Sequence, residues 1–300
     1  MIDLDEFTHK YWGLLSQHAY RLTGSILDAE DITQETMLRV VEMGPSIENI
    51  KNHYEWLHVV ATEAAVGMMH KPIPVEEFDL PDLIQTTGAG ADPDSRPVGG
   101  EAGRPGVTLD FLFPIQYMAP EQRAVVVLRD GFEDGDRVAA SALQVTIQEV
   151  FKIAGEAEKT RAAVRKRWGS TVPFVPLAGD GKTEKVFDRF LEVFRMKDAV
   201  LLQQLVWKNA EMVLETERTT GQDFVAKELS ALSKGMGSKL KFDPIWLNGC
   251  RGVLISYWRA QNSEWLRMSL GLVLCNEREV RALKWYLDGH ILRKIQVDES

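Results

Sequence analysis

The sequence has little of several features that mark particular classes of protein. Cysteine occurs only twice in 300 residues, at Cys250 and Cys275, and the pair has no metal-type spacing. We therefore expect two reduced core thiols rather than a disulfide framework. No apolar run approaches the roughly 20 residues that cross a bilayer, and the acidic start MIDLDEFTHK lacks the apolar core of a signal peptide. These absences predict a cytoplasmic protein with no membrane partner.

Motifs for metals, phosphates and nucleophiles are also missing. The histidines show no metal-ligand spacing, and the sequence has no Gly-rich phosphate loop and no Ser-centred nucleophile motif. The sequence therefore predicts neither a metal nor a cofactor. Positive charge is scarce too, because the net charge is −9 and the pI is about 5.3. Nucleic-acid-binding proteins usually carry a basic stripe or domain, so this balance argues against DNA as the sole partner.

The residues that are present divide the chain into three folded segments and two linkers. Apolar residues recur at helical spacing through 1–70, whereas 71–108 is rich in Pro, Gly and Asp and is expected to be mostly disordered or loosely docked. A second helical segment, 109–168, contains a helix-turn-helix outline and is followed by a Pro/Gly linker, 169–182. The segment 183–300 begins with helices and continues with strand-like runs. It predicts an α+β domain with a curved, mostly antiparallel sheet.

Local signals place several ends of these elements. Asp28 is a candidate N-cap for a helix over 29–43, Pro120 suits a first helical turn, and Thr146 is a candidate N-cap for the second helix of the helix-turn-helix. In the third segment a helix is expected over 224–232. The strand-like runs there are 211–215, 240–247, 252–259, 265–275 and 280–287.

Two stretches resemble a known family. AYRLTGSILDAEDITQETMLRV, residues 19–40, resembles region 2 of the extracytoplasmic-function sigma factors of bacterial RNA polymerase. MAPEQRAVVVLRDGFEDGDRVAASALQVT, residues 118–146, resembles their region 4. The layout of the last segment is similar to a SnoaL-like domain, the cone-shaped fold of polyketide cyclases and ketosteroid isomerases. One group of these sigma factors carries all three parts in this order. The resemblance implies two all-α parts, region 2 and a helix-turn-helix region 4, followed by an α+β cone.

The resemblance also implies a partner. In that family the Asp-Ala-Glu-Asp helix docks on the clamp of core RNA polymerase. The matching positions in this sequence are Asp28, Glu30, Asp31, Gln34 and Glu35. The alternative is that these side chains only cap and solvate a helix, because a domain can keep its fold after losing a function.

The parts that would contact DNA depart from the family pattern. Residues 1–70 carry eleven acidic and four basic side chains, a balance of −7, and phosphate contacts supply most non-specific DNA affinity. On the second helix of the helix-turn-helix, Glu149, Glu156 and Glu158 lie where phosphates are expected. We therefore expect DNA binding to be weak or lost. The candidate DNA contacts that remain are Lys152, Lys159 and Arg161.

Aromatic residues on the strands predict a pocket in the SnoaL-like domain, with room for a small-molecule ligand. Asp288 and His290 share strand parity and are a candidate acid/base pair. The alternative is ordinary core packing, with a turn at Asp288-Gly289. The candidate pocket residues are Trp246, Tyr257, Arg259, Trp285 and Tyr286.

Two functions follow, and the first is slightly favoured. The first is transcription initiation through binding of core RNA polymerase, with the SnoaL-like domain as a regulatory or ligand-sensing module. The second is an enzyme on a sigma-factor scaffold that performs cofactor-free cyclisation, isomerisation or epoxide opening. A third option is a protein that sequesters a ligand or polymerase without chemistry.

Overall fold

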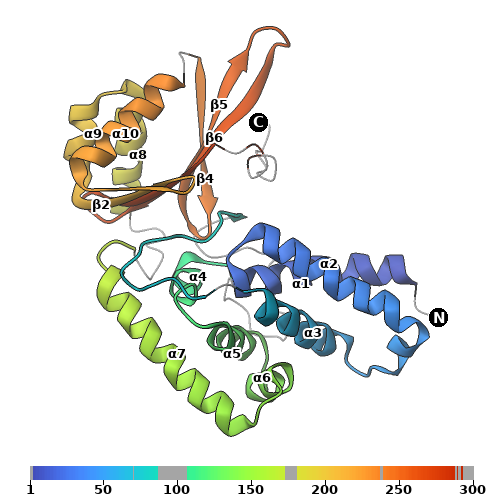
Figure 1. The fold of residues 1–300 in the computed structure, drawn as a ribbon. Coiled ribbons are helices and arrows are strands. Elements are labelled where there is room, and N and C mark those ends of the chain that lie inside the picture. Colours follow the sequence, from blue (N-terminus) through green and yellow to red (C-terminus); the bar gives the residue numbers. More distant parts are fainter. Residues whose placement is uncertain are drawn as a thin grey trace. The chain divides into compact units, whose positions relative to one another are not determined.

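The computed structural model describes residues 3–69, 71–86, 107–172, 181–236 and 239–287, with 289 and 292 (Figure 1). These residues form two compact units. The first is helical and takes the described parts of Met1–Glu77, Arg96–Val107 and Phe111–Arg167. The second holds the sheet and takes the described parts of Phe78–Ser95, Thr108–Asp110 and Trp168–Ser300. Among the described residues, no helix combines the length and hydropathy that a bilayer crossing requires.

Three helices open the first unit: α1 (Leu4–Thr23), α2 (Ile26–Met43) and α3 (His53–Met68), with the 3-10 helix η1 (Gly44–Asn49) between the last two. They pack on one another around fully buried side chains such as Leu15, Ile32 and Leu57. The prediction that Asp28 caps the second helix is wrong. That helix begins at Ile26, three residues earlier than predicted, and its N-cap is Ser25, whose hydroxyl accepts a hydrogen bond from the Asp28 N–H at 3.3 Å.

Four more helices complete this unit: α4 (Leu109–Ile115), α5 (Pro120–Gly131), α6 (Gly135–Leu143) and α7 (Ile147–Trp168). Pro120 lies in the first turn of α5, as predicted. The predicted helix-turn-helix is α6–α7, and its turn places Gln144 in the left-handed region at φ 55°. The apolar core of this part comprises Val125, Leu128, Val138, Ala139, Ala142, Val150 and Ala154.

The second unit is built on a seven-stranded sheet of order β1-β4-β5-β6-β7-β2-β3. Neighbouring strands are antiparallel except β2 and β7, which are parallel. The predicted α+β fold with a curved, mostly antiparallel sheet is therefore confirmed. The strands are β1 (Gln85–Thr86), β2 (Val206–Leu214), β3 (Glu217–Thr220), β4 (Leu240–Leu247), β5 (Cys250–Arg259), β6 (Glu264–Cys275) and β7 (Val280–Tyr286).

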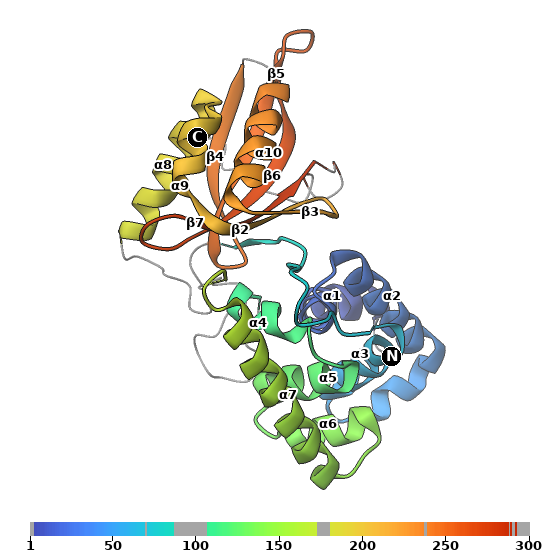
Figure 2. The ribbon, with the colours of Figure 1, turned by 60° about the vertical axis from the view of Figure 1, so that its left-hand side comes forward.

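Three helices cover one face of this sheet: α8 (Lys182–Met196), α9 (Ala199–Leu205) and α10 (Gln222–Gly235) (Figure 1). The long hairpin of β5 and β6 extends past them (Figure 2). The space between helices and sheet is filled by fully buried rings, including Phe187, Phe190 and Phe194 of α8 and Trp285 of β7. Trp285 needs Gly271 beside it, because a Cβ at that position would lie 2.5 Å from the indole ring.

Part of the predicted linker packs on this unit. Residues 78–86, which we call the strap, end in β1, and β1 pairs antiparallel with the end of β4. The Lys284 ammonium donates hydrogen bonds to the carbonyl oxygens of Leu80 and Pro81, and the Tyr286 hydroxyl donates to Asp82 at 3.2 Å. The strap residues Phe78, Leu80 and Leu83 are buried. Because Lys284 and Tyr286 alternate with Trp285 along β7, the strap lies on the face opposite the helices.

Candidate functional site

One face of α2 exposes large apolar side chains. Leu27, Leu38 and Val41 are 58%, 61% and 56% exposed. Their spacing follows the turn of the helix, so they form one continuous stripe that also takes in the exposed Asp31 and Gln34. We call these five residues the α2 stripe. Apolar side chains exposed together on one surface, rather than singly, are typical of a protein-protein contact.

The predicted polymerase-binding residues lie on or beside this stripe. Asp31 and Gln34 are exposed members of it, whereas Asp28, Glu30 and Glu35 are half-buried at its edges. Glu35 is held by Arg39, one helical turn on, at 2.9 Å. The structure therefore brings all five onto one helix, α2. It also adds the three apolar residues that the sequence analysis did not single out, although their 3.6-residue period was a usable signal.

Ion pairs join the two halves of the helical unit. Arg21 of α1 pairs with Asp130 of α5 across 109 positions of sequence. Burial lowers the pKa of the Arg21 guanidinium, and Asp130 opposes that shift. Glu55 of α3 binds Arg137 of α6 through both carboxylate oxygens, at 2.8 and 2.9 Å. The region 2-like helices therefore contact α5 and α6, the helices that precede α7.

Two buried histidines lie at the same junction. The His18 and His58 rings are 4.6 Å apart, and His58 also contacts Phe132, which follows α5, at 5.3 Å. His58 Nδ1 lies 2.7 Å from the Tyr54 carbonyl oxygen, and a carbonyl can only accept, so Nδ1 carries the proton. Burial lowers the pKa of His58 to about 4 and that of His18 well below its usual range. Both rings are therefore neutral near neutral pH.

The glutamates of α7 have different structural roles. Glu149 forms a capping box with Thr146: its carboxylate accepts from the Thr146 N–H at 2.8 Å, and the Thr146 hydroxyl accepts from the Glu149 N–H at 3.3 Å. The Thr146 N–H, and then the Thr146 hydroxyl, lower the pKa of Glu149 by donating to its carboxylate. Glu158 binds Arg161 at 2.9 Å. The Thr-x-x-Glu pattern was visible in the sequence and explains why an acid stands at the start of this helix.

The candidate DNA contacts lie on more than one face of α7. Lys152 and Lys159 are exposed and seven residues apart, so they share a face, and exposed Glu156 lies between them. Arg161 lies on the opposite side of the helix from Lys152, and its guanidinium donates a hydrogen bond to Glu158. Of the three candidate contacts, the two lysines are therefore the ones that can meet a phosphate backbone together.

Comparison with known proteins shows which family this chain is similar to. A family model for Sigma-70 region 2 matches residues 8–69. The ECF RNA polymerase sigma factor SigG of Mycobacterium tuberculosis is 28% identical over 240 residues, which cover 73% of this chain and 62% of SigG. SigJ of the same organism is 29% identical over 176 residues, covering 55% of this chain and 51% of SigJ. This chain is a relative of the extracytoplasmic-function sigma factors.

A solved structure extends the similarity to the whole fold of this sigma-factor relative. The crystal structure of Mycobacterium tuberculosis SigJ matches it with a TM-score of 0.62 at 19% identity, over 97% of this chain and 99% of that one. The predicted family is confirmed, and so is the predicted fold class of a helical sigma-factor part followed by an α+β domain. The alignment to SigG spans less than two thirds of that protein. The enzymatic alternative gains no support from these relatives.

The candidate pocket residues of the SnoaL-like domain do not gather in one place. Trp285 packs inside against Phe194 at 5.2 Å, whereas the neighbouring Tyr286 faces the strap. The other three lie on β4 and β5: Trp246 stacks under Arg251 at 4.8 Å, Tyr257 is 37% exposed, and Arg259 pairs with Glu264 at 3.3 Å. Asp288 and His290, the candidate acid/base pair, lie outside the described residues.

Proposed function

We propose that this sigma-factor relative acts in transcription initiation by binding core RNA polymerase through the α2 stripe. The observation that carries this proposal is the exposure of Leu27, Leu38 and Val41 on a helix inside the matched Sigma-70 region 2 segment. Covering these side chains would remove a large apolar area from water, which is the main driving force of association. Asp31 and Gln34, on the same stripe, would supply polar contacts.

We further propose that binding to promoter DNA is weak without polymerase. Lys152, Lys159 and Lys166 share an exposed face of α7, but Glu156 lies between the first two and repels phosphate. The −7 balance of residues 1–70 adds no compensating attraction. Polymerase would then supply most of the affinity that holds this chain at a promoter.

The SnoaL-like domain is proposed as a regulatory or ligand-sensing module. Its support is the strap, because residues 78–86, which follow the region 2-like helices in the sequence, are held on the sheet by Lys284 and Tyr286. A change in the sheet that loosened these hydrogen bonds would alter the segment that follows region 2.

The direct test is binding of the purified chain to core RNA polymerase, followed by duplex and forked promoter DNA over a salt series. The double variant Leu38→Asp/Val41→Asp is expected to bind polymerase at least about tenfold more weakly, because it places two carboxylates in the apolar contact. Phe224→Asp is the matched control, since Phe224 is 63% exposed on α10 of the other unit. Equal polymerase affinity of wild type and double variant would refute the role of the α2 stripe.

A further inference from the structure

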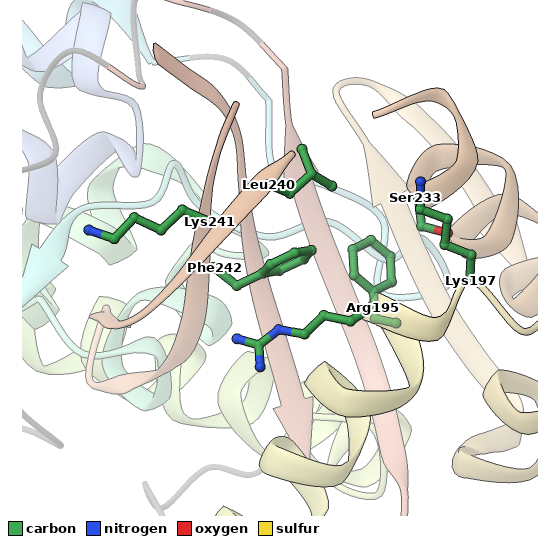
Figure 3. A pocket seen from close by; sticks show the side chains of 7 residues that line it. Arg195, Lys197, Ser233, Leu240, Lys241 and Phe242 are labelled. Atoms are coloured by element: carbon green, nitrogen blue, oxygen red, sulfur yellow. The ribbon is translucent and has the colours of Figure 1, made fainter. Parts of the chain in front are cut away.

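A pocket lies at the margin of the SnoaL-like domain, lined by Phe194 and by residues that belong to none of the candidate sites above. It opens where α8 ends, beside α10 and the start of β4, and has a volume of about 480 Å³ (Figure 3). This falls within the roughly 300–1,000 Å³ that is typical of small-molecule sites. The interior of the cone is filled by aromatic rings, so this marginal pocket is the stronger candidate for a ligand.

The floor of the pocket is apolar. The rings of Phe194 and Phe242 meet edge to face, with their centroids 6.1 Å apart. Leu240 is two residues from Phe242 on β4, and its side chain lies on the same side of the strand (Figure 3). Aromatic walls of this kind suit a flat or chain-like apolar body. The floor thus predicts a ligand with a hydrophobic part.

The charges at the rim are positive. Arg195 and Lys197 line the pocket, and none of its lining residues is acidic. The Arg195 guanidinium lies over the Phe242 ring, 4.9 Å from its centroid, and it forms no ion pair with any residue that the structure describes. Lys241 also borders the pocket, but its ammonium points away (Figure 3) and pairs with Asp243 at 3.2 Å.

The Ser233 hydroxyl is the other polar group of the pocket, and its hydrogen bond limits which ligands the pocket can bind. The buried Ser233 hydroxyl donates its hydrogen to the Ser230 carbonyl oxygen at 2.9 Å. It therefore has no hydrogen left for an anion, and an anionic group has to be bound by the cations. Arginine binds carboxylates through two parallel N–H donors, which gives both affinity and orientation.

The wider charge distribution favours the same ligand class. Residues 182–286 carry seventeen basic and thirteen acidic side chains, a balance of +4, although the whole chain is at −9. The part of the chain that holds this pocket thus attracts anions, whereas residues 1–70 repel them.

We propose that this pocket binds an organic carboxylate with an apolar body, such as an aryl or medium-chain acid. The Arg195 guanidinium binds the carboxylate, the body packs on the half-buried Phe242 and Leu240, and Lys197 adds positive potential from the other side. An effect of this ligand on transcription rests on the proposed sensing role of the domain, but the binding of the ligand does not. Ligand binding is measured without polymerase, so the two can fail separately.

The backbone provides a clean variant at Lys197. This residue ends α8 in the left-handed region, at φ 59°, where glycine is the favoured residue. Lys197→Gly therefore removes a cation without straining the fold. Arg195→Gln removes the other cation, and Arg189→Gln is its matched control on the same helix, because Arg189 is exposed and bound to Glu192 outside the pocket.

The experiment titrates the full chain at neutral pH with 2-naphthoate, decanoate and the neutral isostere 2-naphthamide. Affinity is measured by calorimetry, and the site is located by amide chemical shifts. We expect at least one acid to bind and to shift the amides of residues 194–197 and 240–242. The amide isostere and Arg195→Gln should each bind about tenfold more weakly, Lys197→Gly a few-fold more weakly, and Arg189→Gln like wild type.

Any one of the following results would overturn the proposal. One is the absence of binding by either acid up to about 5 mM, the weak end of measurable affinity. Another is equal binding of naphthoate and naphthamide, which would make the pocket apolar only. The last is unchanged affinity in Arg195→Gln, or chemical shifts confined to residues outside the pocket.

Discussion

Lys284 donates hydrogen bonds from its buried ammonium group to the backbone carbonyl oxygens of Leu80 and, at 3.3 Å, Pro81, more than 200 positions earlier in the chain. Asp79 lies 3.8 Å from the same nitrogen. Burial lowers the pKa of Lys284, and the nearby Asp79 and Asp82 carboxylates oppose that shift. One side chain of the last strand therefore fixes a segment that the sequence analysis placed in a linker.

Replacing this lysine should release the strap. In Lys284→Met the carbonyl oxygens of Leu80 and Pro81 lose a buried donor, so the free energy of unfolding of the second unit should fall by about 1–3 kcal/mol. Hydrogen exchange should speed up over residues 80–86 and stay unchanged in α1. Lys208→Met, at an exposed position of β2, is the control. Unaltered exchange in the strap would mean that apolar burial alone holds it.

Removing Asp130 should separate the two halves of the helical unit. Its partner Arg21 has a side chain only 12% exposed, so Asp130→Ala leaves a buried guanidinium without this carboxylate and should cost about 3 kcal/mol. Fluorescence energy transfer between labels on α2 and α7 reports the separation. Asp136→Ala, which breaks the more exposed pair with Arg129, should cost less than about 1 kcal/mol. Similar losses in both variants would contradict a special role for the buried pair.

The histidine pair should make stability depend on pH. Because the pKa of folded His58 is about 4, below its usual 6.5, the unfolded chain binds more protons between these values. The free energy of unfolding should therefore fall as the pH drops from about 7 to about 4, by roughly 3 kcal/mol for His58. In His58→Phe this part of the pH dependence should disappear, whereas the exposed His9→Gln should keep it. Denaturant unfolding across the pH range measures both.

Reversing one charge on α7 should strengthen DNA binding. Glu156→Lys completes an exposed run with Lys152 and Lys159, so the slope of log affinity against log salt should steepen by about one. Glu149→Lys is the comparison, because it also adds positive charge but breaks the capping box with Thr146. It should lower the melting temperature as well. An unchanged salt slope in Glu156→Lys would show that this face of α7 does not meet the phosphate backbone.

The strands of the sheet were largely predictable because their apolar runs are long. The run 240–247 coincides with β4, and the runs 252–259, 265–275 and 280–287 fall within two residues of β5, β6 and β7. Two strands were missed for a physical reason. Glu217–Thr220 and Gln85–Thr86 are short and polar, and what makes them strands is pairing with residues distant in the chain.

The candidate sites, like the strands, were only partly predictable from the sequence. The α2 stripe could be predicted from the helical periodicity of its residues and from the resemblance of this segment to a known family. The pocket at Arg195 could not be predicted, because it depends on how the end of α8 meets β4, which no local pattern encodes. Tyr257 and Trp285 looked like pocket residues by composition, yet one is partly exposed and the other fills the core.

The strap also sets an order of events during synthesis. Helices α1, α2 and α3 contact one another and lie close together in the sequence. They can therefore fold soon after they leave the ribosome. The strap is made soon after them, but β7, the strand that carries Lys284, is made about 200 residues later. Residues 78–86 therefore wait through the production of about 200 further residues, and the sheet domain can close only after β7 has been made.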